Sequence, residues 1–62
     1  MTNEEIKNLR YKMYLTQAEF GKLLGVTEQT VRAWELNKKN PHLRNQKKLL
    51  DLCKKENIKI KG

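Results

Sequence analysis

The chain has 62 residues, 37% of them hydrophobic and 34% charged, which suits one small domain without a deep cleft beside its core. No apolar run approaches the roughly 20 residues that span a bilayer. The N-terminal MTNEEIKNLR lacks the apolar region of a signal peptide. We therefore expect a cytoplasmic domain that does not act at a membrane. The lone Cys53 cannot form an internal disulfide, and its apolar neighbours predict a reduced, buried thiol.

The net charge of +7 is unevenly distributed along the chain. Residues 1–36 hold five basic and five acidic residues, whereas residues 37–62 hold nine basic and two acidic ones. A basic half of this kind favours a polyanionic partner, with nucleic acid ahead of a membrane surface. A need for solubility alone is a simpler explanation of this basic charge, so the choice between the two explanations depends on the sequence motifs.

Two predicted helices come first, and each begins with a capping box, in which a Thr cap precedes a Glu at the third helical position. Thr2 and Glu5 start a helix over residues 3–13. Thr16 and Glu19 start a second helix over residues 17–24. Apolar or small residues recur at helical spacing in both helices, at Ile6, Leu9 and Met13 and then at Phe20, Gly21 and Leu24.

The third and fourth predicted helices cover residues 28–37 and 41–55. Thr27 caps the third, while Asn40 caps the fourth and Pro41 takes its first helical position. Four apolar residues of the last helix are expected to face inward, namely Leu43, Leu49, Leu50 and Cys53. We assign residues 1–56 to the domain and residues 57–62 to a basic tail. In that tail Ile58 and Ile60 alternate with polar residues, which is compatible with a short strand.

The second and third helices are joined by only three residues, Gly25-Val26-Thr27, which is the spacing of a helix-turn-helix. Gly21 supplies the small residue that a close contact needs, and Gly25 tolerates a positive φ in the turn. At about 100° per residue, one face of the third helix carries Val31, Trp34 and Glu35. The opposite face carries Gln29, Ala33 and Leu36, with Arg32 on its flank.

The stretch QAEFGKLLGVTEQTVRAWE, followed by NKKNP, resembles the lambda-repressor-like, Cro-type (XRE-type) helix-turn-helix DNA-binding proteins. The resemblance covers about residues 3–53. The matching positions are Gln17, Gly21, Gly25, Val31, Trp34, Glu35 and Pro41. It implies an all-α, compact domain of four to five helices that binds operator DNA, usually as a homodimer. After Cys53 the family continues with an apolar fifth helix, whereas this chain has KKENIKIKG.

In proteins of this type, the N-terminal part of the third helix contacts base edges in the major groove. Gln29 is the strongest candidate, because its amide can pair with adenine N6 and N7, and Arg32 can reach guanine or a phosphate. Glu28 can accept from cytosine N4, although a favourable interaction with the helix dipole is the simpler explanation of this carboxylate. Thr27 and Ala33 can contact thymine methyl groups, while Thr27 also serves as a cap.

Phosphate contacts are expected on both sides of the groove. The resemblance implies one at Gln17, where a helix N-terminus favours an anion. The remaining candidates are Thr30, the loop residues Asn37, Lys38, Lys39 and Asn40, and Arg44, with His42 as a further donor.

Glu35 shares the inward face of the third helix with Trp34, which is an unusual position for a carboxylate. A buried charge needs a partner, and the resemblance implies that this partner is Arg10 of the first helix. Trp34 itself is expected in the core rather than stacked on a base.

The leading function is therefore sequence-specific binding of double-stranded DNA by a transcriptional regulator, with a repressor of phage or mobile-element type as the expectation. The alternative is an antitoxin-type module that binds a toxin protein and represses its own operon. A third candidate is a non-specific polyanion binder. No acid–base pair, phosphate-binding Gly loop or metal-ligand spacing is present in the sequence, so we expect neither an enzyme nor a cofactor or metal. For self-association, Leu49, Leu52 and the Ile58/Ile60 tail are the candidates.

Overall fold

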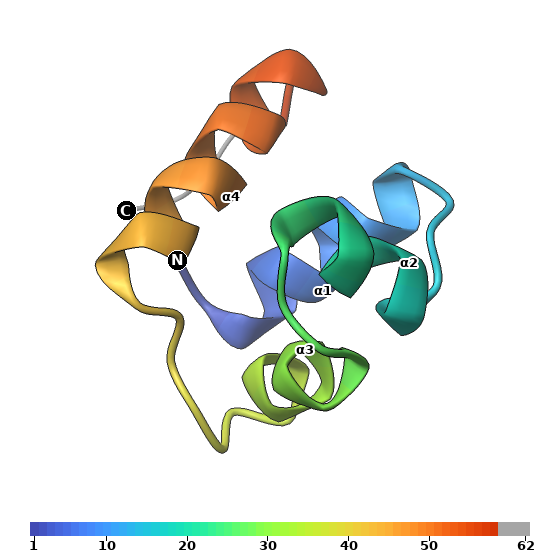
Figure 1. The fold of residues 1–62 in the computed structure, drawn as a ribbon. Helices are drawn as coiled ribbons and strands as arrows, with labels where there is room; N and C mark the ends of the chain where they lie inside the picture. Colours follow the sequence, from blue (N-terminus) through green and yellow to red (C-terminus); the bar gives the residue numbers. More distant parts are fainter. Residues whose placement is uncertain (59–62) are drawn as a thin grey trace.

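The computed structural model describes residues 1–58, and these residues form four α-helices and no strand. The helices are α1 (Asn3–Lys12), α2 (Gln17–Leu24), α3 (Glu28–Glu35) and α4 (Leu43–Lys55). In Figure 1, α1 lies between α3, at the bottom of the view, and α4, at the upper left, and it contacts both helices. The predicted all-α class is confirmed. Of the suggested terminal strand, Ile58 lies outside any strand, and Ile60 lies outside the described residues.

The first three helices begin where the capping residues predicted. Thr2 and Thr16 each accept a hydrogen bond from the backbone N–H of the Glu three residues later, at 3.1 Å in both cases. Each Glu carboxylate accepts in return from the Thr backbone N–H, at 2.8 and 2.9 Å. At α3, Thr27 Oγ1 accepts from the backbone N–H of Thr30 at 3.2 Å. These bonds satisfy donors that a helix start otherwise leaves unpaired.

The C-terminal end of α3 and the start of α4 differ from the prediction. Helix α3 ends at Glu35 rather than at residue 37, because Asn37 adopts φ +59° and closes the helix with a left-handed residue. Helix α4 begins at Leu43, and its N-cap is His42, which makes no side-chain capping bond. The cap predicted at Asn40 is wrong. Pro41 is buried in the preceding loop, and its carbonyl accepts a hydrogen bond from Gln46 Nε2 at 2.8 Å.

One core joins the four helices. Its buried members are Ile6, Leu9, Phe20, Leu24, Val31, Trp34, Leu49 and Cys53. The inward placement predicted for Leu43 and Leu50 is wrong, since they are 80% and 42% exposed. Leu49 and Cys53 lie four residues apart on the buried stripe of α4, and Leu50 is rotated about 100° away from it. The burial predicted for Cys53 is confirmed, and this burial raises the pKa of its thiol.

Two glycines shape the connection between α2 and α3. Gly25 ends α2 at φ +78°, a left-handed conformation that side chains disfavour. Gly21 lies against the turn itself, because a Cβ there would come within 2.8 Å of the Val26 carbonyl oxygen and 3.1 Å of that of Thr27. These are backbone atoms, which cannot move aside as a flexible side chain can. The small residue is therefore needed for the turn backbone as well as for the helices.

We expect Gly21→Ala to destabilise the domain by about 1–3 kcal/mol, because the added methyl group overpacks the turn. Urea denaturation followed by circular dichroism measures this change. Lys22→Ala is the matched control on the same helix, since Lys22 is exposed, and it should leave the unfolding midpoint nearly unchanged. Equal midpoints for the two variants would contradict the close approach.

Candidate nucleic-acid interface

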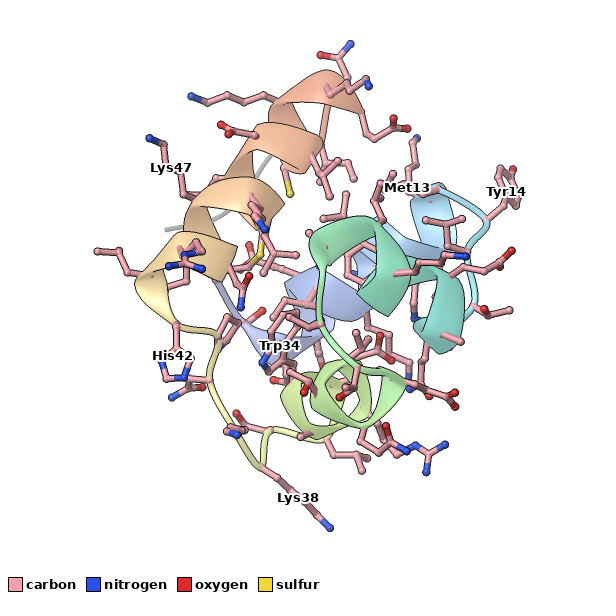
Figure 2. The ribbon with its side chains drawn as sticks, in the orientation of Figure 1. Met13, Tyr14, Trp34, Lys38, His42 and Lys47 are labelled. Atoms are coloured by element: carbon pink, nitrogen blue, oxygen red, sulfur yellow. The ribbon has the colours of Figure 1, made fainter. Side chains whose placement is uncertain are left out.

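Helix α3 has one face locked into the domain and one face open to solvent. Val31, Trp34 and Glu35 are buried, and Figure 2 shows Trp34 on the side of α3 that faces the other helices. Gln29 and Arg32 are exposed on the other side. The helix therefore presents an amide and a guanidinium to solvent while its apolar side fixes its orientation.

A hydrogen-bonded network around the Glu35 carboxylate holds α3 in place. Arg10 Nε donates to Glu35 Oε2 at 2.6 Å, and Arg10 Nη2 donates to Oε1 at 2.9 Å. The same guanidinium donates through Nη1 to the Leu15 carbonyl at 3.0 Å. Because the two side chains are only 10% and 4% exposed, this two-pronged pair is shielded from water. It is the Arg10–Glu35 ion pair that the sequence resemblance implied.

The network also includes Gln17, which gives this residue a contact that the sequence did not reveal. Its Nε2 donates to Glu35 Oε1 at 3.2 Å, so its side-chain amide lies on the ion pair. Its backbone N–H lies in the first turn of α2, where helix geometry leaves donors free for an anion. Asn3 adds a further bond from Nδ2 to the Glu35 backbone carbonyl, at 3.2 Å. Both residues are far from Glu35 in sequence, and neither contact has a local signal.

Two pairs of polar side chains on α3 are bonded to each other. Thr27 Oγ1 and Thr30 Oγ1 are 2.8 Å apart, so these hydroxyls are engaged in the cap. Arg32 Nη2 donates to Glu28 Oε2 at 3.3 Å across one helical turn. The side-chain amide of Gln29, in contrast, makes no hydrogen bond within residues 1–58, and it is exposed. Gln29 therefore offers a free donor and acceptor, as base reading requires.

The predicted phosphate-contacting residues after α3 all reach solvent. The exposed residues are Asn37, Lys38, Lys39, Asn40, His42 and Arg44. Figure 2 shows Lys38 pointing away from the domain on the side where α3 lies. The half-buried members of the predicted interface are Gln17, Thr30 and Ala33. The structure thus brings the outward face of α3 and a basic loop to adjoining parts of the surface.

Other kinds of site are not evident in the part of the chain that the structure describes. Within residues 1–58, no group of three or more His, Cys, Asp or Glu side chains could hold a metal ion. None of the four helices combines the length and the apolar character needed to cross a membrane.

A family model with the description helix-turn-helix, covering Cro/C1-type proteins of the XRE family, matches residues 6–56. The chain belongs to this family. Its members are DNA-binding regulators rather than enzymes, so the protein is a DNA-binding regulator of the XRE type. Neither a curated protein nor a solved structure matches the chain significantly.

Replacing Arg10 with Ala should cost about 3 kcal/mol of unfolding free energy, because Glu35 would remain buried without its cation. Urea denaturation at neutral pH measures the loss. Lys12→Ala, an exposed position on the same helix, is the control and should change little. An Arg10→Ala variant as stable as the control would mean that the pair contributes nothing to the fold.

The Glu35 carboxylate should also make stability depend on pH. Burial raises its pKa, but the hydrogen bonds from Arg10 and Gln17 and the Arg10 charge outweigh this, so its pKa lies below the ordinary value. Its contribution to stability is therefore complete above the ordinary glutamate pKa of about 4.3 and is lost as the pH falls through the lower folded value. Urea denaturation at pH 6 and pH 3 should show that the unfolding free energy falls less between these two pH values for Glu35→Gln than for the unmodified protein. Identical losses would disprove the shift.

Proposed function

We propose that this protein is a sequence-specific transcriptional regulator that acts in the cytoplasm as a repressor, of the kind found in phages and mobile elements. In this proposal α3 enters the major groove of operator DNA, and occupancy of the operator blocks RNA polymerase. The observation that carries it is the exposed amide of Gln29, which makes no hydrogen bond to residues 1–58 and stands on a helix whose opposite face is held by Trp34 and Glu35. A rigid helix presenting a free amide suits direct reading of base edges.

The proposed contacts are of two kinds: contacts to bases determine which DNA sequence is recognised, and contacts to phosphates position the protein on the duplex. We assign Gln29 to adenine and Arg32 to guanine, with Glu28 beside them. Thr27 and Ala33 lie against thymine methyl groups. Phosphate contacts are assigned to the backbone N–H of Gln17, to Thr30, to the loop residues Asn37, Lys38, Lys39 and Asn40, and to Arg44. The exposure of that loop and its lysines supports this division.

We further propose that two copies bind together, through a face of α4 that the sequence did not single out. Leu49 is fully buried and Leu52 half-buried, so the self-association predicted through Leu49 is wrong. Leu43 and Leu50 instead line a shallow apolar hollow on α4, together with Arg44, Gln46 and Lys47. Half-sites lie about 34 Å apart on DNA, and the domain measures 26 Å along its longest axis. At this spacing two bound copies lie side by side, and we assign the contact between them to the exposed leucines of α4.

Selection of bound duplexes from a random pool tests the function and the dimer together. We expect a palindromic consensus with half-sites about 10 base pairs apart, preferred over unrelated DNA by about a thousandfold or more. Gln29→Ala should reduce the preference for adenine at one position by about 1–3 kcal/mol. Asn8→Ala, an exposed amide on α1, is the matched control and should leave the consensus unchanged.

The outcomes of this selection separate the candidates. Enrichment of no sequence would reject the regulatory proposal and favour a non-specific polyanion binder. The Leu50→Glu variant should still select single half-sites but no longer a palindromic pair of them. Selection of the same palindrome by this variant would reject the α4 contact. The antitoxin alternative would use the same exposed leucines and basic side chains of α4, because they also suit an acidic protein partner. A toxin that co-purifies with the protein and is lost from Leu50→Glu would favour that alternative.

A further inference from the structure

Glu28 and Arg32 form a bonded pair on the outward face of α3. Their side chains remain 45% and 57% exposed, so the pair stands in solvent rather than in the core. One guanidinium nitrogen of Arg32 donates to one carboxylate oxygen of Glu28 at 3.3 Å. An arginine has five N–H donors and a carboxylate has two acceptor oxygens, so both groups keep unused hydrogen-bonding capacity. The pair thus offers donors and an acceptor side by side.

This arrangement matches the major-groove edge of one base pair. A G·C pair presents guanine N7 and O6 as acceptors, followed by the cytosine N4 amino group as a donor. Guanidinium donors can meet the two acceptors while the adjacent carboxylate accepts from the amino group. An A·T pair has the adenine N6 donor at its centre, which would oppose the guanidinium donors. A C·G pair presents the same groups in reverse order.

We propose that Glu28 and Arg32 read a single G·C base pair as one unit, with Arg32 on guanine and Glu28 on its paired cytosine. The inference rests on the proposed function, since it requires α3 to lie in the major groove. Glu28 has a second effect on the same contact. Its negative charge disfavours a nearby phosphate, so it keeps the Arg32 guanidinium off the DNA backbone and on the base edge.

Competition binding on the selected site tests the unit. The duplexes are the selected site and a copy with the assigned G·C pair changed to A·T, and the proteins are Glu28→Gln, Arg32→Gln and the double variant. Each single variant should lower the preference for G·C by roughly fivefold to 150-fold, the value of one good base contact. The double variant should lose no more than either single one, because the two side chains act together.

Charge-matched controls separate base reading from general electrostatics. Glu4→Gln and Lys12→Gln make the same charge changes at exposed positions on α1. They should shift the affinity for both duplexes equally and leave the ratio unchanged. Thermal denaturation of all variants should show midpoints within a few degrees of the unmodified protein, since every substituted side chain lies at the surface.

Two results would overturn the inference while leaving the proposed function intact. In the first, Glu28→Gln tightens binding to both duplexes equally, which would make Glu28 only a repulsive charge. In the second, the two single variants alter preference at two different base pairs and their effects add. If the unmodified protein selects no site at all, the proposed function itself fails.

Discussion

The buried bond between Arg10 and Glu35 is the interaction on which the rest of this small domain depends. It links α1 to α3. Gln17 brings the start of α2 to the same carboxylate, and Asn3 ties the start of α1 to the backbone carbonyl of Glu35. A domain of this size has little core with which to fix the orientation of a short helix. The network supplies that orientation through directed bonds, which apolar packing alone does not.

As a consequence, the two faces of α3 have different roles. The inner face is occupied by packing around Trp34 and by the ion pair, so it has no freedom to meet a ligand. The polar groups of the outer face differ in their hydrogen bonding. The Thr27 and Thr30 hydroxyls are used in the cap, Glu28 and Arg32 are bonded to each other, and the Gln29 amide makes no hydrogen bond to residues 1–58. These differences determine what each group can offer DNA, which the residue types alone do not reveal.

The basic charge of the second half of the chain is spread over more surface than the candidate interface. Lys38 lies beside α3 at the bottom of the view in Figure 2, whereas Lys47 extends from α4 at the upper left, away from α3. Only part of the excess charge is therefore available for direct phosphate contacts. The remainder adds to the long-range field that attracts a polyanion, an effect that weakens with salt.

Sequence alone determined the features that depend on residues within about four positions of each other. The two capping boxes, the left-handed Gly25, the two-faced α3 and its Thr27 cap all follow from such local bonds. The Glu28–Arg32 bond has the same four-residue spacing, so it was accessible from the sequence as well. The Arg10–Glu35 pair was found only through family resemblance. Tertiary structure decided the Gln17 contact, the late start of α4 and the exposure of Leu43 and Leu50. These depend on how the helices cross and on which stripe of α4 meets the core, and no local bond specifies either.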